Sequence, residues 1–135
     1  MMSASERRIT PADILPNDAF LARRKELRAA SIARKKNRRV EVGPYATFYF
    51  ENYESMWLQV QEMLRIEKGG DEQLQGELEV YNPLIPQGAE LIATLMLEID
   101  DPVRRESILR RLAGIEESVT LDLEGSVIAA TPTDY

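Results

Sequence analysis

Seven polar side chains in the middle of the chain could together bind a cation or transfer protons. Glu62 and Arg65 are three residues apart, a spacing that places both on one face of a helix. Carboxylates combined with a tyrosine and an asparagine can hold a hard cation or act as general acid and base. The ligand-binding candidates are Glu51, Gln61, Glu62, Arg65, Glu77, Tyr81 and Asn82.

The same side chains also have a purely structural explanation. Glu62 and Arg65 would form a salt bridge along one helix, Tyr81 would belong to the core, and Asn82 would cap a helix end. Helix-face ion pairs are far commoner than carboxylates with perturbed pKa values, so the structural explanation is favoured. The two explanations differ in geometry, because a site requires the carboxylates and Tyr81 to converge on one concave pocket.

The chain contains no cysteine and no histidine, which removes most of the common mechanisms. Disulfides, thiolate nucleophiles, Cys-ligated iron–sulfur clusters, Ser-His-Asp triads and histidine bases are excluded within the chain. The usual zinc ligands and the Glu-x-x-His pairs of di-iron sites are missing too. Gly69-Gly70 lacks the spacing of a phosphate-binding loop. We therefore expect no resident metal or cofactor, and we favour a protein without independent catalytic activity.

Charge is distributed very unevenly along the chain. Residues 1–39 contain 11 Lys/Arg against 4 Asp/Glu, a net charge of +7, and residues 40–135 contain 6 against 19, a net charge of −13. Opposite surface potentials steer association, so the basic segment could bind an acidic protein surface or a second copy of the chain. The partner-binding candidates are Arg24, Arg28, Arg34, Lys35, Arg38 and Arg39.

Nucleic acid is not the expected partner of this basic segment. The isoelectric point near 4.8 opposes phosphate binding, and no recognisable reader motif accompanies the basic residues. Arginine outnumbers lysine among the candidates, which favours bidentate contacts to phosphates or to the carboxylates of an acidic protein surface.

The first elements that must position these side chains are helical. Residues 1–9 are polar and aperiodic, so we expect them to be disordered. Thr10-Pro11-Ala12-Asp13 predicts a short capped turn that Pro16 ends. A basic helix follows from about residue 17 to 36, and we expect it to dock on its alanine side, with residues 10–37 forming a basic helical arm.

The middle of the chain predicts a hairpin and two more helices. Arg39–Val42 and Tyr45–Glu51 are β-favouring segments joined by a turn at Gly43. Asn52 is positioned to cap a helix over residues 53–68. Asp71 is positioned to cap a second helix over residues 72–82.

The last third of the chain predicts a strand, a helix and a terminal hairpin. Residues 90–99 form the most apolar stretch, which is typical of a central strand buried on both faces. A helix follows from Asp101 to Gly114. Two short alternating segments, 119–123 and 126–130, flank a tight turn. The inward-facing helix residues are expected to be Val103, Ile108, Leu109 and Leu112.

The order of these elements indicates a single α+β domain over residues 1–135. Its sheet is expected to be mainly antiparallel, with about five strands covered by helices. No apolar run approaches the roughly 20 residues of a membrane-spanning helix, and the first residues lack the apolar core of a signal peptide. We expect a cytoplasmic protein that does not bind membranes.

Short sequence segments spread along the chain carry a resemblance to a known family. They are Thr10–Pro16, Lys36–Val40, Gly43-Pro44, Thr47-Phe48, Phe50–Asn52, Gln59–Arg65, Glu77-Leu78, Tyr81–Pro86 and Glu90-Leu91. The chain resembles the bacterial domain-of-unknown-function family 3501 over nearly its whole length. That family has no established activity, and its members tend to be encoded near rubrerythrin-like and iron–sulfur oxidoreductase proteins. The resemblance implies an accessory role in redox or oxidative-stress metabolism.

Two hypotheses follow. The leading one is an accessory protein that docks on a redox enzyme through its basic N-terminal helix, with self-association as a variant. The alternative is a carboxylate-based metal- or small-molecule-binding protein, with or without enzymatic activity, whose site lies where the first hairpin meets the two central helices.

Overall fold

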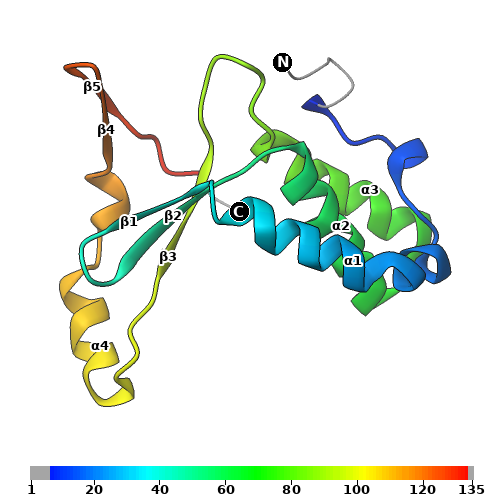
Figure 1. Cartoon of the computed structure of the whole chain (residues 1–135), viewed down its shortest axis with the longest axis horizontal. Coiled ribbons are helices and arrows are strands. Elements are labelled where there is room, and N and C mark those ends of the chain that lie inside the picture. The colour runs from blue at the N-terminus through cyan, green and yellow to red at the C-terminus, as the bar shows by residue number, and fades with distance from the viewer. Residues whose placement is uncertain (1–6, 134–135) are drawn as a thin grey trace. The chain divides into compact units, whose positions relative to one another are not determined.

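The structure is a computed structural model that describes residues 7–133. The chain divides into two compact units, one ending at Leu97 and the other beginning at Glu98. Both units combine helices with antiparallel strands, which confirms the α+β class (Figure 1). Of the nine N-terminal residues expected to be disordered, residues 1–6 lie outside the described part. For Ile9 the expectation is wrong, because its side chain is only 1% exposed.

The first unit begins with a short turn and a long helix. In the turn Pro11–Asp13, the carboxylate of Asp13 accepts the backbone N–H of Thr10 at 2.9 Å, as the capping pattern predicts. Helix α1 then runs over Asn17–Lys35.

The expectation that α1 docks on its alanine side is wrong. Phe20 and Ser31 are buried, and Arg24 and Leu27 between them are partly buried. The spacing 20, 24, 27 and 31 places these residues on one face. The fully exposed alanines are Ala22, Ala29 and Ala33.

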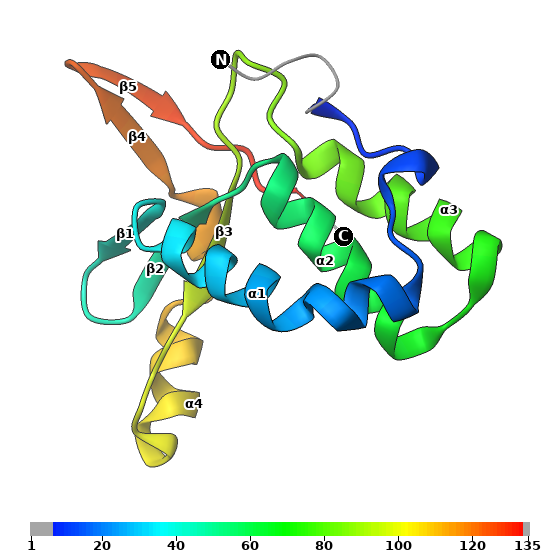
Figure 2. The ribbon, with the colours of Figure 1, turned by 45° about the vertical axis from the view of Figure 1, so that its right-hand side comes forward.

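Helices α2 and α3 follow, joined by a short turn, and pack side by side in opposite directions (Figure 2). Helix α2 covers Tyr53–Glu67 and begins as predicted, with Asn52 Oδ1 accepting the N–H of Ser55 at 2.9 Å. Helix α3 covers Gly70–Tyr81. Asp71 does not cap α3. The helix begins at Gly70, so Asp71 lies inside it and Gly69 is the N-cap. A short 3₁₀ turn, Asn82–Leu84, continues from the end of α3.

The core of the first unit lies among its helices. Its buried members come from the N-terminal segment, α2, α3 and the loop after it: Ile9, Met56, Val60, Leu64, Leu78 and Ile85. Helix α1 adds Phe20, whose ring meets that of Trp57 edge-on with centroids 6.3 Å apart. No strand residue belongs to this cluster. The helices therefore bury their apolar surface against one another.

The sheet of the first unit has three antiparallel strands in the order β1-β2-β3. Strand β1 covers Arg39–Val42, β2 covers Ala46–Phe50 and β3 covers Ala93–Leu97. The hairpin β1–β2 is as predicted, with Gly43 at φ +66° in its turn. The prediction of a central strand near residues 90–99 is wrong, because β3 is an edge strand and Ala93 and Met96 are exposed.

The second unit contains one helix and one hairpin. Helix α4 covers Pro102–Arg111, and Asp101 Oδ1 caps it by accepting the N–H of Val103 at 2.9 Å. Strands β4, Thr120–Leu123, and β5, Ser126–Ala129, pair antiparallel. The five expected strands are thus divided between two sheets.

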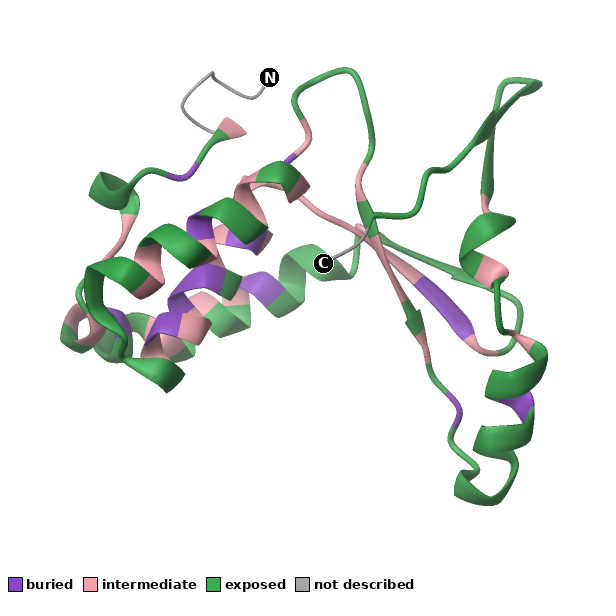
Figure 3. Cartoon of the chain, turned by 180° about the vertical axis from the view of Figure 1, so that it is seen from behind, coloured by how far each residue is buried: buried purple, intermediate pink, exposed green. Residues whose placement is uncertain are grey.

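Only part of the predicted inward face of α4 is inward. Ile108 is buried and Leu112 is partly buried, but Val103 is 88% exposed and Leu109 is 41% exposed. Figure 3 shows α4 and the hairpin exposed over most of their length. Across residues 7–133, we find no helix with the length and apolar character needed to cross a bilayer.

Candidate functional site

Two amide side chains fasten the N-terminal segment to the helical core. Asn82 Oδ1 accepts the N–H of Ile9 at 2.7 Å, and Asn82 Nδ2 donates to the Ile9 carbonyl at 3.0 Å. Gln61 makes the same pair of bonds to Leu15, at 2.7 Å and 3.3 Å. The side chain of Gln61 is fully buried. Both amides are ligand-binding candidates from the sequence. Each one bonds to both the N–H and the carbonyl of a single backbone residue, in the way that a neighbouring β-strand would.

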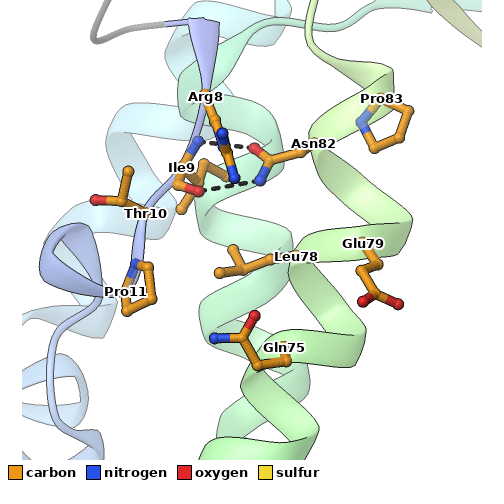
Figure 4. A pocket seen from close by; sticks show the side chains of 9 residues that line it. All are labelled: Arg8, Ile9, Thr10, Pro11, Gln75, Leu78, Glu79, Asn82 and Pro83. Carbon is orange, nitrogen blue, oxygen red and sulfur yellow. Dashed lines mark hydrogen bonds between the residues drawn. The ribbon is translucent and has the colours of Figure 1, made fainter.

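A groove of about 360 Å³ lies between the N-terminal segment and α3. Figure 4 shows Leu78 and Gln75 pointing from α3 toward that segment, with Asn82 closing one end. The groove is lined by Arg8, Ile9, Thr10, Pro11, Gln75, Leu78, Glu79, Asn82 and Pro83. Asn82 is the one ligand-binding candidate among these residues, so the groove does not gather the carboxylates that the alternative hypothesis requires.

Glu62 is held between two arginines. Arg24 on α1 binds it side-on, with Nε to Oε1 at 2.8 Å and Nη2 to Oε2 at 3.2 Å, and Arg65 Nε lies 3.2 Å from Oε2. The hydrogen bond from Arg24 lowers the pKa of Glu62 below its ordinary value, and Arg65 adds to this against the opposing effect of burial. The same bond raises the pKa of Arg24. This triad joins α1 to α2, and it leaves Glu62 ionised and occupied rather than ready to transfer a proton.

The other candidates lie on different elements. Glu51 follows β2, and its carboxylate accepts a hydrogen bond from Thr94 Oγ1 at 2.7 Å. Tyr81 ends α3, packs against the core and has Gln59 Nε2 at 3.5 Å from its hydroxyl. Glu77 is partly buried on α3. Of these groups, Tyr81 lies where the structural explanation predicted it, against the core.

The carboxylates of the described residues do not form a metal site. Within residues 7–133, no three acidic side chains gather in a way that could hold a metal ion. No contact described for this part of the chain favours the carboxylate-based alternative over the structural explanation.

Some of the six partner-binding candidates form ion pairs with carboxylates of the described residues, and others do not. Besides Arg24, Arg34 pairs with Glu54 at 2.9 Å, and Arg39 pairs with Glu41 at 2.5 Å. Arg39 also lies 5.8 Å from the ring centroid of Tyr49. Arg38 is partly buried, with Nη1 enclosed and lacking a hydrogen-bond partner. Arg28 and Lys35 are exposed and form no ion pair with a carboxylate of the described residues.

Arg28 and Lys35 belong to one exposed face of α1, which we call the basic face. It consists of Leu21, Lys25, Arg28, Ile32, Lys35 and Lys36, all of them exposed. Leu21 is 53% exposed and Ile32 is 59% exposed, so two aliphatic side chains lie among four cations that form no ion pair with another described residue. The residues 21, 25, 28 and 32 each follow one residue after the inward series 20, 24, 27 and 31. The basic face therefore lies about 100° round the helix from the inward face.

Comparison with known proteins identifies the family of the chain and a similar solved structure. A family described as a protein of unknown function (DUF3501) matches residues 8–135. The chain belongs to the DUF3501 family. A crystal structure of a novel protein of unknown function from Burkholderia pseudomallei is 36% identical to it, with a TM-score of 0.84. The match covers 91% of this chain and 71% of the Burkholderia chain. No curated protein matches the sequence significantly.

The basic face of this DUF3501 protein includes four residues absent from the predicted partner-binding set. They are Leu21, Lys25, Ile32 and Lys36. The alternating spacing of four and three residues is visible in the sequence, but the face 20-24-27-31 has the same spacing. Which of the two faces is buried depends on long-range contacts, such as that of Phe20 with Trp57 and that of Arg24 with Glu62.

Proposed function

We propose that this DUF3501 protein is a cytoplasmic accessory protein that docks on an acidic surface of a partner protein through the basic face of α1. The observation that carries the proposal is the set of four exposed cations on that face, none of which forms an ion pair within residues 7–133. The neighbouring arginines Arg24 and Arg34 are already neutralised within the chain. The basic face is therefore a positive surface without an internal counterpart, on a protein whose net charge is −6.

The aliphatic residues of the basic face support a protein partner rather than a nucleic acid. Ile32 lies between Arg28 and Lys35, and Leu21 lies one turn before Lys25. Both expose more than half of their surface. A protein interface buries such side chains at its centre and surrounds them with charged and polar groups. Phosphate backbones offer no comparable apolar contact, and non-specific nucleic-acid binding depends on the cations alone.

The class of partner that we propose is an oxidoreductase. Support for this part comes from the family resemblance, whose members tend to be encoded near rubrerythrin-like and iron–sulfur oxidoreductase proteins. A basic docking face suits such a role, because charge complementarity accelerates encounter and selects partners without needing a large interface. The accessory protein would contribute binding and would leave the redox chemistry to its partner.

The test compares two double charge reversals of equal size. Arg28→Glu with Lys35→Glu changes the basic face. Arg23→Glu with Lys68→Glu changes two exposed cations elsewhere in the first unit, so it is the matched control. Full-length protein and both variants are immobilised and exposed to cytoplasmic extract of the native host at low and high salt, with bound proteins identified by mass spectrometry.

The proposal expects a defined oxidoreductase to be retained by the wild type and the control but lost from the basic-face variant. High salt should release it, because the Debye length falls from about 10 Å at 0.1 M to about 3 Å at 1 M. Retention of the same proteins by both variants would contradict docking through this face. Salt-sensitive binding of a purified DNA duplex, lost in the basic-face variant, would replace the protein partner with nucleic acid.

A further inference from the structure

The second unit has very little interior of its own. Among its described residues, 98–133, the buried side chains are Ile99 and Ile108, 7% and 6% exposed. Every residue of β4 and β5 is exposed. An isolated two-stranded hairpin is at best marginally stable in water and needs a further apolar surface against one face. The hairpin β4–β5 therefore needs another apolar surface packed against one of its faces to be stable.

That face is defined by the pairing of the two strands. Leu121 lies directly opposite Ile128, and Leu123 lies two residues further along β4 on the same side. These three side chains are 39%, 50% and 58% exposed. The opposite side carries Asp122 and Val127, which also face each other. The hairpin thus has an aliphatic side and a mixed side, and we call the first the hairpin face.

Helix α4 offers a second uncovered apolar surface in the same unit. Pro102 and Leu109 line an open groove of about 440 Å³ along the helix. The other lining residues are Arg105, Glu106 and Arg110. Leu109 is 41% exposed, so α4 and the hairpin do not cover one another within the chain.

The two surfaces have opposite charge. Helix α4 contains four arginines and one glutamate, a net charge of +3, whereas residues 115–130 contain four carboxylates and no cation, a net charge of −4. The cations are Arg104, Arg105, Arg110 and Arg111, and the carboxylates are Glu116, Glu117, Asp122 and Glu124. The lengths agree as well, since the ten residues of α4 span about 15 Å and the four of β4 about 14 Å.

We propose that the second unit is a homodimer interface in which α4 of one copy covers the hairpin face of the other. Because each chain carries one basic helix and one acidic hairpin, the exchange is reciprocal and closes with two-fold symmetry. Leu121, Leu123 and Ile128 pack on the groove along Pro102 and Leu109. The arginines of α4 meet the carboxylates that flank the hairpin. This interface is separate from the basic face of α1, so a dimer would present two copies of that face.

Reciprocal charge reversal tests the proposal with full-length chains. One variant makes the helix acidic through Arg104→Glu and Arg111→Glu, and the other makes the hairpin segment basic through Glu116→Lys, Glu117→Lys and Glu124→Lys. All five positions are exposed, and none forms an ion pair with another described residue. Native mass spectrometry and light scattering report whether each sample has the 15.4 kDa mass of one chain or twice that mass.

The wild type should have the double mass, and each variant alone should shift to the single mass, since like charges then face each other across both halves of the interface. Mixing the two variants should restore the double mass, because every acidic helix then meets a basic hairpin. A chain carrying all five substitutions should dimerise with itself for the same reason. A misfolded variant could not be rescued in this way.

Two outcomes would overturn the proposal. One is a wild type with the mass of a single chain at high protein concentration, which would leave the hairpin face to another occupant. The other is a dimer that survives in both separate variants, which would place the interface elsewhere on the chain.

Discussion

The two units of this DUF3501 protein satisfy their polar and apolar groups in different ways. The first unit gathers Ile9, Phe20 and Val60 into an interior with exposures of 1% or less. The amide side chains of Gln61 and Asn82 hold its N-terminal segment in place. The second unit buries only two aliphatic side chains among residues 98–133. The two units therefore differ in how much interior each has within one chain, and the second unit leaves most of its side chains exposed.

The largest expected effect comes from opening the interior of the first unit. Phe20 is completely buried, and its ring contacts Trp57. Phe20→Ala should lower the free energy of unfolding by about 3–5 kcal/mol, because a cavity replaces the ring. Urea denaturation followed by tryptophan fluorescence measures this change.

The matched control for this substitution lies in the second unit. Val127 is 68% exposed on the mixed side of the hairpin. Val127→Ala should change the free energy of unfolding by less than about 0.5 kcal/mol. Equal losses in the two variants would remove the contrast between the units.

The next effect comes from the buried amide of α2. Gln61→Leu would leave the N–H and carbonyl of Leu15 without the hydrogen-bond partners that the fully buried Gln61 side chain supplies. We expect a loss of about 2–3 kcal/mol in the free energy of unfolding. Gln59→Leu, on the exposed side of the same helix, should cost less than about 0.5 kcal/mol. If the two substitutions cost the same, the N-terminal segment is not held by this amide.

A smaller, pH-dependent effect comes from the Arg24–Glu62–Arg65 triad. Because folding lowers the pKa of Glu62, its contribution to stability is fully present above the ordinary carboxyl value of 4.5 and is lost as the pH falls through the lowered value. Glu62→Gln should therefore be less stable than the wild type at pH 7, and the difference should close in acid. Thermal unfolding at a series of pH values measures it, and a difference independent of pH would contradict the assignment.

The smallest effect is expected at the basic face. Arg28→Glu with Lys35→Glu should leave the free energy of unfolding within about 0.5 kcal/mol of the wild type, because both side chains are exposed and unpaired. Arg24→Glu, one turn away, should destabilise the protein clearly by placing a second carboxylate beside Glu62. Thermal unfolding of both variants at neutral pH separates a docking residue from a structural one.

Local signals in the sequence predicted the ends of most elements. The Asn52 cap of α2 and the Glu124-Gly125 turn of the last hairpin depend on residues within four positions of one another. Such features follow from backbone conformation and short-range hydrogen bonds, which a single sequence reveals.

Long-range pairing could not be predicted in the same way. The inward face of α1 includes Arg24 and Ser31, which no hydrophobic pattern selects. Arg24 is partly buried there because it pairs with Glu62, 38 residues away in the sequence. The apolar stretch at 90–99 was compatible with a central strand. In the structure β3 is an edge strand because β2 is the one strand in its sheet that it pairs with. The roles of Gln61 and Asn82 likewise depend on backbone groups 46 and 73 residues distant.

Amide hydrogen exchange at two protein concentrations tests the contrast between the units most directly. Amides of α2 and α3 should be protected equally at low and high concentration, because the first unit is stable without a partner. Amides of β4 and β5 should exchange quickly in dilute protein and become protected as the concentration rises. Strong protection of the hairpin that does not depend on concentration would contradict the account, since the second unit would then be complete within one chain.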